Sequence, residues 1–375
     1  MDGSRQLKIA HVDTGQEFRG GQRQLLRLAR GLRQGGHRQI IVCPDGSRLE
    51  ARALAEGFTV FALPDHDPAH AHGIIQFRQQ LLADPLHILH AHDGRGQTIA
   101  WLASLGMGMP RLASRRVTFL PETPFIHRVK YDYTCDALIA VSGFIRQLLV
   151  DSGVPPGKIE VIPDGIEIPP VLPDAECRSR VRAAWGYGEH EFVVGHLGAF
   201  TPEKGQDLAV EALNLLASTL PQARLVLMGE GPLRERLPSN PSFQKVESQV
   251  LLLRDVEDLS NFFAGLDLFI MPSRAEGLGS AALLAMAHGL AVIASRVGGL
   301  PEIVEEHQTG WLIPPGSASA LAEAIIAAAS DRAGLAQLGA NARETARRFS
   351  ADIMVDRTEA LYFRLVEWES RSAAR

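Results

Sequence analysis

The 375-residue sequence predicts two α/β domains in tandem, each a doubly wound parallel sheet with helices on both faces. The chain is longer than one ordinary hydrophobic core supports. Short apolar runs alternate with amphipathic stretches, which is the pattern of repeated strand–helix–strand units. The alternation stops once, in a proline-containing stretch, and then resumes. We therefore expect two Rossmann-like domains with a ligand cleft between them.

The first domain is expected over residues 1–168. Between its first two strands lies an amphipathic helix with four arginines off its apolar face: Arg23, Arg27, Arg30 and Arg33. A solvated helix face is the default interpretation of these arginines, and contact with anionic lipid is the alternative. The strands are expected at residues 7–12, 39–43, 59–63, 87–91, 137–141 and 159–162.

Residues 169–190 contain three prolines and are expected to connect the two domains. The second domain is expected over residues 191–350, and a terminal helix over residues 351–375. The strands of the second domain are expected at residues 192–197, 224–228, 250–252, 268–271 and 291–294. The longest apolar stretch, 279–294, contains a histidine and a glycine, so we interpret it as helix, turn and strand rather than a membrane span.

Composition and charge argue against several classes of function. The formal net charge of -5 gives no reason to expect nucleic acid as the main partner. The three cysteines are far apart and odd in number, so they predict neither a disulfide framework nor a zinc site. The sequence does not open on a charged-then-apolar leader. We expect a cytoplasmic protein.

The stretch 271–301 carries the strongest signal of a ligand site. A strand ends there and a helix begins, which places Glu276, Gly277, Leu278 and Gly279 at the helix amino end. Amide groups and the helix dipole favour an anion at such a place, and glycines allow a phosphate or sugar to approach the backbone. Glu276 would repel phosphate but suits hydrogen bonds to sugar hydroxyls. Alternatively, it only occupies the favourable first turn of the helix.

Two more strand-to-helix loops resemble ligand-binding loops. Gly198 follows a strand and Lys204 precedes the next helix, where a lysine can neutralise diphosphate charge. A lone lysine is otherwise a solvated surface residue. Gly20 and Gly21, between the first strand and the first helix, also permit close approach to the backbone. The spacing of a dinucleotide site is missing, so nicotinamide chemistry is not expected.

Together these segments resemble glycosyltransferase family 4, which has the GT-B fold of two facing Rossmann-like domains. The resemblance extends over nearly the whole chain. It rests on Gly20-Gly21, VSGFI at 141–145, VIPDGIE at 161–167, PEKG at 202–205, MGEGP at 228–232, RDV at 254–256, PSRAEGLG at 272–279 and GGLPE at 298–302. The resemblance implies a retaining, front-face transfer of a sugar from a nucleotide-diphosphate sugar, without a metal or cofactor. Such catalysis depends on positioning and electrostatic stabilisation.

The resemblance also implies roles for single residues. Lys204 would hold the diphosphate, and Glu276 with the amides of residues 277–279 would bind the donor sugar. The backbone near Val256 would meet the base, and the loop of Gly20 and Gly21 would lie against phosphate and sugar.

In the first domain, the resemblance would place His92 facing the cleft, near donor or acceptor. Because His90 alternates with His92 along a strand, at most one of them is expected to face the cleft.

Three positions depart from the family pattern. Leu284 stands where a second glutamate usually bonds the ribose, and Ala199 stands where an arginine often helps to bind the diphosphate. The strand after Pro110 often ends in histidine, whereas here it ends in Arg115 and Arg116. We hypothesise that Arg116 or Arg254 supplies the missing positive charge.

Two histidine-containing patterns suggest metal sites. Asp65-His66-Asp67 has the Asp-x-Asp form with which other glycosyltransferases hold a metal, but it lies away from every other family match. His66, His70 and His72 lack a cysteine or carboxylate cluster at ligand spacing. We expect a solvated loop here and no metal.

Two functions remain as alternatives to the transferase. A nucleotide-sugar epimerase on the same fold would release a changed sugar without an acceptor, and a degenerate transferase would only bind a nucleotide sugar or a partner protein. Leu284 and Ala199 favour the degenerate protein, whereas Lys204, Glu276 and the glycines argue against it. For a transferase, we expect a cell-surface glycan or glycolipid precursor as acceptor, in polysaccharide or lipopolysaccharide assembly, with possible peripheral contact with the inner membrane face.

Overall fold

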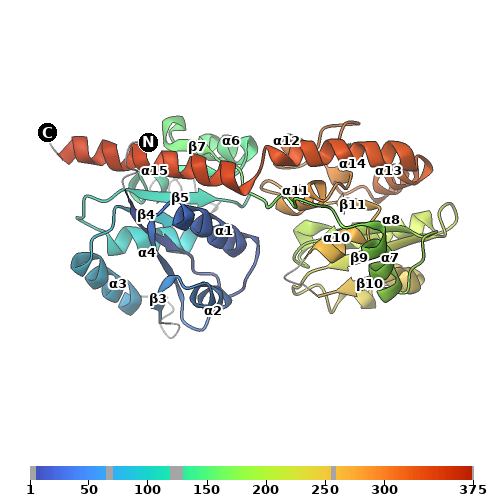
Figure 1. Cartoon of the computed structure of the whole chain (residues 1–375), viewed down its shortest axis with the longest axis horizontal. Helices are drawn as coiled ribbons and strands as arrows, with labels where there is room; N and C mark the ends of the chain where they lie inside the picture. Colours follow the sequence, from blue (N-terminus) through green and yellow to red (C-terminus); the bar gives the residue numbers. More distant parts are fainter. Residues whose placement is uncertain (1–5, 65–70, 119–129, 255–258, 374–375) are drawn as a thin grey trace. The chain divides into compact units, whose positions relative to one another are not determined.

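The computed structural model describes residues 6–64, 71–118, 130–254 and 259–373. The chain divides into two compact units, each described by itself below (Figure 1). Unit 1 consists of the chain up to Gly165 together with the segment from Ala351 onward, and unit 2 consists of Ile166–Ser350. The C-terminal helix therefore belongs to unit 1, and the boundary falls three residues before the expected one.

Unit 1 contains a seven-stranded parallel sheet in the order β3-β2-β1-β4-β5-β6-β7. The order changes direction between β1 and β4, which makes the carboxyl ends of these strands the topological switch point. The strands are β1 Lys8–Val12, β2 Arg38–Pro44, β3 Thr59–Leu63, β4 Ile88–Ala91, β5 Arg111–Arg115, β6 Ala137–Ala140 and β7 Ile159–Val161. The helices are α1 Gly20–Gln34, α2 Arg48–Ala55, α3 Ala71–Ala83, α4 Gly94–Ala103, α6 Gly143–Asp151 and α15 Ala351–Ala373.

Unit 2 repeats this plan with a six-stranded parallel sheet in the order β10-β9-β8-β11-β12-β13. Its switch point lies between β8 and β11. The strands are β8 Phe192–Leu197, β9 Ala223–Met228, β10 Val250–Leu253, β11 Leu268–Met271, β12 Val292–Ser295 and β13 Gly310–Ile313. The helices are α7 Ala175–Ala184, α8 Gln206–Leu216, α9 Pro241–Val246, α10 Ser260–Ala264, α11 Ser280–Ala287, α12 Leu300–Ile303, α13 Ala318–Ser330 and α14 Arg332–Arg347.

The segment expected to connect the domains contributes α7 to unit 2. Arg178 and Arg182 of α7 both donate to the Asp267 carboxylate, at 2.5 and 2.6 Å, and Arg182 is 1% exposed. A buried charge of this kind is tolerated only when it is paired and hydrogen-bonded. This ion-pair cluster therefore ties α7 to the start of β11.

The terminal helix α15 comes after unit 2 in the sequence but packs in unit 1, where it lies along α1 (Figure 1). Its inward side buries four residues against the sheet and α1: Met354, Leu361, Tyr362 and Val366. These side chains complete the hydrophobic core on that face of the sheet, which explains why residues distant in sequence fold into the first unit.

The arginines of α1 are not simply solvated. Arg30 pairs with both carboxylate oxygens of Glu56, at 2.7 and 2.6 Å, and Arg27 donates to the Gly165 carbonyl. The Arg33 guanidinium lies 4.1 Å from the centre of the Phe58 ring. These contacts join α1 to the neighbouring elements of unit 1, while Arg33 is exposed and the Arg30 side chain is 43% exposed, so the arginines are solvated side chains that also make local contacts.

Within the described part of the chain, no helix combines the length and the apolar character needed to cross a membrane.

Candidate functional site

The switch point of unit 2 brings Lys204 and Glu276 together. Lys204 ends the turn after β8, and Glu276 lies between β11 and α11. The Lys204 Nζ and Glu276 Oε2 atoms are 2.6 Å apart, and the two side chains are 21% and 12% exposed. A cation and a carboxylate thus share one partly open site at the carboxyl edge of the sheet.

Close backbone contacts hold the two loops in this position. The Arg274 amide donates to the Glu203 carbonyl at 2.7 Å. Gly205 has φ +71°, and a Cβ there would lie 2.2 Å from the Pro272 carbonyl oxygen. A Cβ on Gly298 would lie 1.7 Å from the Glu276 carbonyl oxygen. Only glycine fits at both positions, so these two residues allow the loops to approach the pair.

The amino end of α11 adjoins the ion pair. Gly277, Leu278 and Gly279 are buried, and the Gly277 amide donates to Glu276 Oε1 at 3.3 Å. Leu284 lies in the second turn of α11 and is half-buried, so this turn offers no carboxylate at that position. The partial positive charge of the helix amino end faces the same edge of the sheet as Lys204.

Gly198 and Ala199 follow β8 directly. Gly198 donates to the Met228 carbonyl at 3.0 Å, and a Cβ on Gly229 would lie 2.0 Å from the Gly198 carbonyl oxygen. The loops after β8 and β9 are therefore in close contact at the edge of the sheet.

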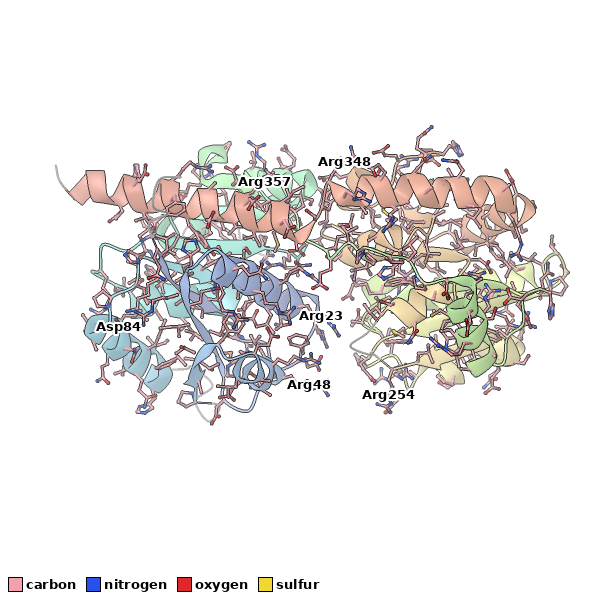
Figure 2. All side chains as sticks on the ribbon, viewed as in Figure 1. Arg23, Arg48, Asp84, Arg254, Arg348 and Arg357 are labelled. Carbon is pink, nitrogen blue, oxygen red and sulfur yellow. The ribbon has the colours of Figure 1, made fainter. Side chains whose placement is uncertain are left out.

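An open cavity of about 590 Å³ lies at the carboxyl ends of β9 and β10. Its lining is mostly apolar and consists of Arg180, Val181, Ala184, Trp185, Met228, Leu253, Arg254, Asn261 and Phe262. Arg254 itself is 80% exposed and pairs with Glu230 at 3.3 Å; its side chain lies on the surface of unit 2 (Figure 2). Val256, expected beside the base, lies outside the described residues.

In unit 1, Gly20 and Gly21 are the first two residues of α1. A Cβ at either position would meet nothing within 4 Å, so the backbone there is open to a ligand. This loop is anchored by Asp13 at the end of β1, whose Oδ1 accepts from the Gly15 amide at 2.9 Å and from Gln22 Nε2 at 2.7 Å.

Asp13 was not expected from the sequence. It is 1% exposed, and burial, together with the nearby charge of Asp93, raises its pKa to about 6. A single aspartate after a strand carries no sequence signal of this kind, because the shift depends on which groups surround it.

The Asp13→Asn variant should stabilise unit 1 at pH 8. Because burial raises the pKa of Asp13 in the folded state, the folded protein favours the protonated carboxyl group. Its contribution to the free energy of unfolding is therefore complete below pH 4 and is lost as pH rises through 6. Asparagine keeps the acceptor oxygen but carries no charge. We therefore expect the free energy of unfolding to increase by on the order of 2–3 kcal/mol at pH 8, and by much less at pH 4. Urea unfolding at both pH values measures it. An equal effect at the two pH values would contradict this assignment.

His92 and Arg116 are both at the carboxyl edge of unit 1. Arg116 Nε donates to Asp164 Oδ1 at 2.9 Å, and Arg116 Nη1 lies 3.4 Å from His92 Nδ1. The side chains of Arg116 and Asp164 are 15% and 9% exposed. Asp164 thus orients the arginine that stands where the family often has a histidine.

His90 and His92 lie on the same face of the sheet, with ring centres 4.1 Å apart. The expectation that at most one of them faces the site from this strand was wrong in its reasoning, because residues two apart in a strand point to one side. Their environments differ, however. His90 is fully buried between Tyr362 and Ser114, whereas His92 is 5% exposed and contacts Arg116.

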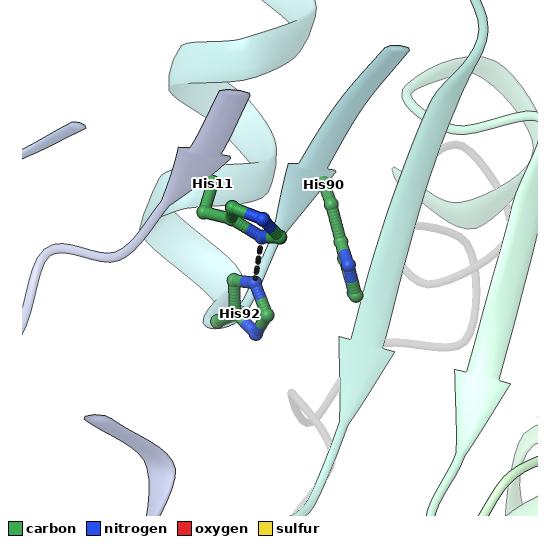
Figure 3. A group of neighbouring side chains, drawn as sticks. All are labelled: His11, His90 and His92. Carbon is green, nitrogen blue, oxygen red and sulfur yellow. Dashed lines mark hydrogen bonds between the residues drawn. The ribbon is translucent and has the colours of Figure 1, made fainter. Parts of the chain in front are cut away.

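His11 joins these two histidines, and one ligand atom from each ring lies within 4.8 Å of the others (Figure 3). Such a group could hold a metal ion, but every ring nitrogen already has a hydrogen-bond partner. The expected absence of a metal stays a prediction. Asp65, His66, Asp67 and His70 lie outside the described residues.

Comparison with known families covers both units. The family model described as "Glycosyltransferase Family 4" matches residues 18–168, and the one described as "Glycosyl transferases group 1" matches residues 178–345.

Several curated proteins are similar to this chain. A GDP-mannose-dependent alpha-(1-6)-phosphatidylinositol monomannoside mannosyltransferase of Mycolicibacterium smegmatis is 33% identical over 199 residues, 51% of this chain and 52% of the relative. The chain thus spans about half the length of this relative. The N-acetyl-alpha-D-glucosaminyl L-malate synthase of Bacillus anthracis is 25% identical over 315 residues, which are 82% of this chain and 81% of that protein.

Solved structures share the fold. Anabaena HepE in complex with UDP superposes with a TM-score of 0.85 at 22% identity, over 95% of this chain and 99% of that chain. WaaG, a glycosyltransferase involved in lipopolysaccharide biosynthesis, gives a TM-score of 0.73 at 18% identity, over 95% and 99% of the two chains. The predicted GT-B fold class, with two parallel-sheet α/β domains, is confirmed.

Proposed function

Since this chain belongs to glycosyltransferase family 4, we propose that it transfers a sugar from a nucleotide-diphosphate sugar to an acceptor hydroxyl, with retention of configuration. The observation that carries this proposal is the pairing of Lys204 with Glu276 beside the amino end of α11. A cation, a carboxylate and a helix dipole within one edge of a sheet suit a ligand with both an anionic and a hydroxyl-rich part.

Lys204 neutralises the charge that develops on the diphosphate as its bond to the anomeric carbon breaks. The dipole of α11 acts on the same anion. Glu276 accepts hydrogen bonds from hydroxyls of the donor sugar, and diphosphate binding separates it from Lys204. The acceptor oxygen attacks from the side that the diphosphate leaves, and its proton passes to a diphosphate oxygen.

The apolar cavity beyond β9 and β10 receives the base. Its aromatic and aliphatic lining offers a surface on which a flat ring stacks. The names of the relatives support two donor classes, because one is GDP-mannose-dependent and one solved structure contains UDP. We take a GDP-sugar or a UDP-sugar as the donor.

Unit 1 supplies the acceptor side. His92 and Arg116 can together accept from and donate to a polar substrate group. The acceptor that we propose is a polar head group of a cell-surface glycan or glycolipid precursor. This proposal is supported by relatives that act on a phosphatidylinositol mannoside or take part in lipopolysaccharide biosynthesis. Peripheral contact with a membrane surface and a cytoplasmic location are part of the same proposal.

Incubation with donor sugars tests the function directly. The full chain is mixed with GDP-mannose or UDP-glucose in the presence of EDTA, first alone and then with glycolipid acceptors. Release of nucleotide diphosphate with product of unchanged anomeric configuration, followed by NMR, supports a metal-independent retaining transferase. An altered free sugar would instead identify an epimerase. Donor binding without turnover, with every acceptor, would favour the non-catalytic protein.

A further inference from the structure

The buried polar groups of unit 1 form a chain that runs from Arg116 to helix α1. Arg116 Nη1 is 3.4 Å from His92 Nδ1, and His92 Nε2 is 3.0 Å from His11 Nδ1 (Figure 3). His11 Nε2 is 3.0 Å from Gln39 Oε1, and Gln39 Nε2 donates to the Ala29 carbonyl at 2.8 Å. His11, Gln39 and His92 are at most 8% exposed.

The two ends of this chain determine the direction of every hydrogen bond in it. A guanidinium only donates, and a carbonyl only accepts. Gln39 must therefore turn its amide toward Ala29 and its oxygen toward His11, which gives His11 a proton on Nε2.

His11 and His92 are both neutral near pH 7. Burial lowers the pKa of His11 to about 4, and burial with the neighbouring histidine and Arg116 brings the pKa of His92 well below its ordinary value. A neutral imidazole has one protonated and one bare nitrogen. His11 consequently accepts at Nδ1, His92 donates from Nε2, and His92 Nδ1 is bare.

We propose that Gln39 and His11 are positioning residues that hold His92 as the Nε2–H tautomer, so that its bare Nδ1 accepts a hydrogen bond from a substrate hydroxyl beside Arg116. The inference rests on the proposed transferase function for the identity of the hydroxyl, which belongs to the donor sugar or the acceptor. In Figure 3 the second nitrogen of His92 points away from His11. At that nitrogen, Arg116 Nη1 is the donor in this structure.

The histidine cluster is thereby assigned to hydrogen bonding rather than to metal binding. A metal would need a bare nitrogen from each ring. His11 Nδ1 is already used by His92, and both nitrogens of His90 are within 2.7 Å of the Tyr362 and Ser114 hydroxyls. The Arg116 charge beside His92 further disfavours a cation there.

The tautomer is measured by NMR of the full chain labelled with 15N-histidine, with His11→Gln and His92→Gln used to assign signals. A protonated Nε2 and a bare Nδ1 on both residues are expected. A protonated Nδ1 on His92 would overturn the proposal. So would a shift of the bare nitrogens on addition of one equivalent of Zn²⁺, which would show a metal site. Neither reading depends on catalysis.

Gln39→Glu tests the consequence. A carboxylate cannot donate to the Ala29 carbonyl, so its oxygens should turn toward His11 Nε2. Paired with this charge, His11 should become doubly protonated, donate from Nδ1 to His92 Nε2 and so place the single His92 proton on Nδ1, which the same 15N spectrum reports. We expect kcat for hydrolysis of the nucleotide sugar that the wild-type chain uses, GDP-mannose or UDP-glucose, to fall at least tenfold. The KM for that nucleotide sugar should change little. Gln79→Glu, on the exposed side of α3, is the matched control and should leave both unchanged.

The two proposals fail in different ways. If Gln39→Glu reverses the His92 tautomer but leaves turnover unchanged, the positioning role of Gln39 and His11 is contradicted. The proposed transferase function is not affected by that result. If no nucleotide sugar is bound by the wild-type chain, the proposed function fails whatever the NMR spectrum shows. Thermal unfolding of Gln39→Glu confirms that the compared proteins are folded.

Discussion

Replacing Lys204 with alanine should reduce turnover of the donor sugar about 10²- to 10³-fold, the size expected when one preorganised stabiliser of developing charge is removed. Lys204 is the cation paired with Glu276 at the switch point of unit 2. The loss should appear mainly in kcat, because the charge on the leaving diphosphate is larger in the transition state than in the bound donor. Steady-state release of nucleotide diphosphate, followed at several donor concentrations, measures both constants.

Lys245→Ala is the matched control for this variant, since Lys245 is an exposed lysine on α9 of the same unit. It should retain full turnover. Lys204→Arg should recover only part of the activity, because a guanidinium is larger and differently shaped from an ammonium. An unchanged kcat in Lys204→Ala would contradict the role of Lys204 in stabilising the leaving diphosphate and would favour the interpretation as a solvated surface residue.

Glu276→Gln should lower turnover of the donor sugar without weakening the binding of the free nucleoside diphosphate. The hydrogen bonds of a carboxylate to sugar hydroxyls contribute about 1.5–3 kcal/mol, so turnover should fall about 10- to 100-fold. Free nucleoside diphosphate should bind at least as tightly as before, because Lys204 no longer has a competing anion 2.6 Å away. Titration with the nucleoside diphosphate and with the nucleotide sugar gives the two affinities.

The control for Glu276→Gln is Glu323→Gln, at an exposed position on α13. Tenfold weaker binding of the free diphosphate in Glu276→Gln would mean that Glu276 only shapes the loop. Since Lys204 and Glu276 contact each other, the double variant should not show the sum of the two single effects.

Most of the fold could be predicted from the sequence because hydrophobic alternation repeats with the period of strand–helix–strand units. Strand β13 was missed, since its four residues begin with a glycine and follow a turn-rich stretch. The place of α7 was also not predicted. Its assignment to unit 2 depends on Arg182 meeting Asp267, two residues far apart in sequence.

The site could be predicted in part. Lys204 and Glu276 were selected separately, because each lies between the end of a strand and the start of the next helix. Their 2.6 Å contact follows from the parallel sheet that aligns those strand ends. Asp13, His11 and Gln39 were missed because nothing in their local sequence shows which groups they pair with. Their properties arise from contacts between β1, β2 and α1, which only the folded unit brings together.

The central claim is that the Lys204–Glu276 edge of unit 2 binds the diphosphate of a nucleotide sugar. Titration calorimetry of the full chain with UDP, GDP and ADP, in EDTA, tests it most directly. We expect one-site binding of UDP or GDP, weaker in Lys204→Ala and unchanged in Lys245→Ala. Binding by none of the three nucleotides, or equal affinity in wild type and Lys204→Ala, would contradict the account.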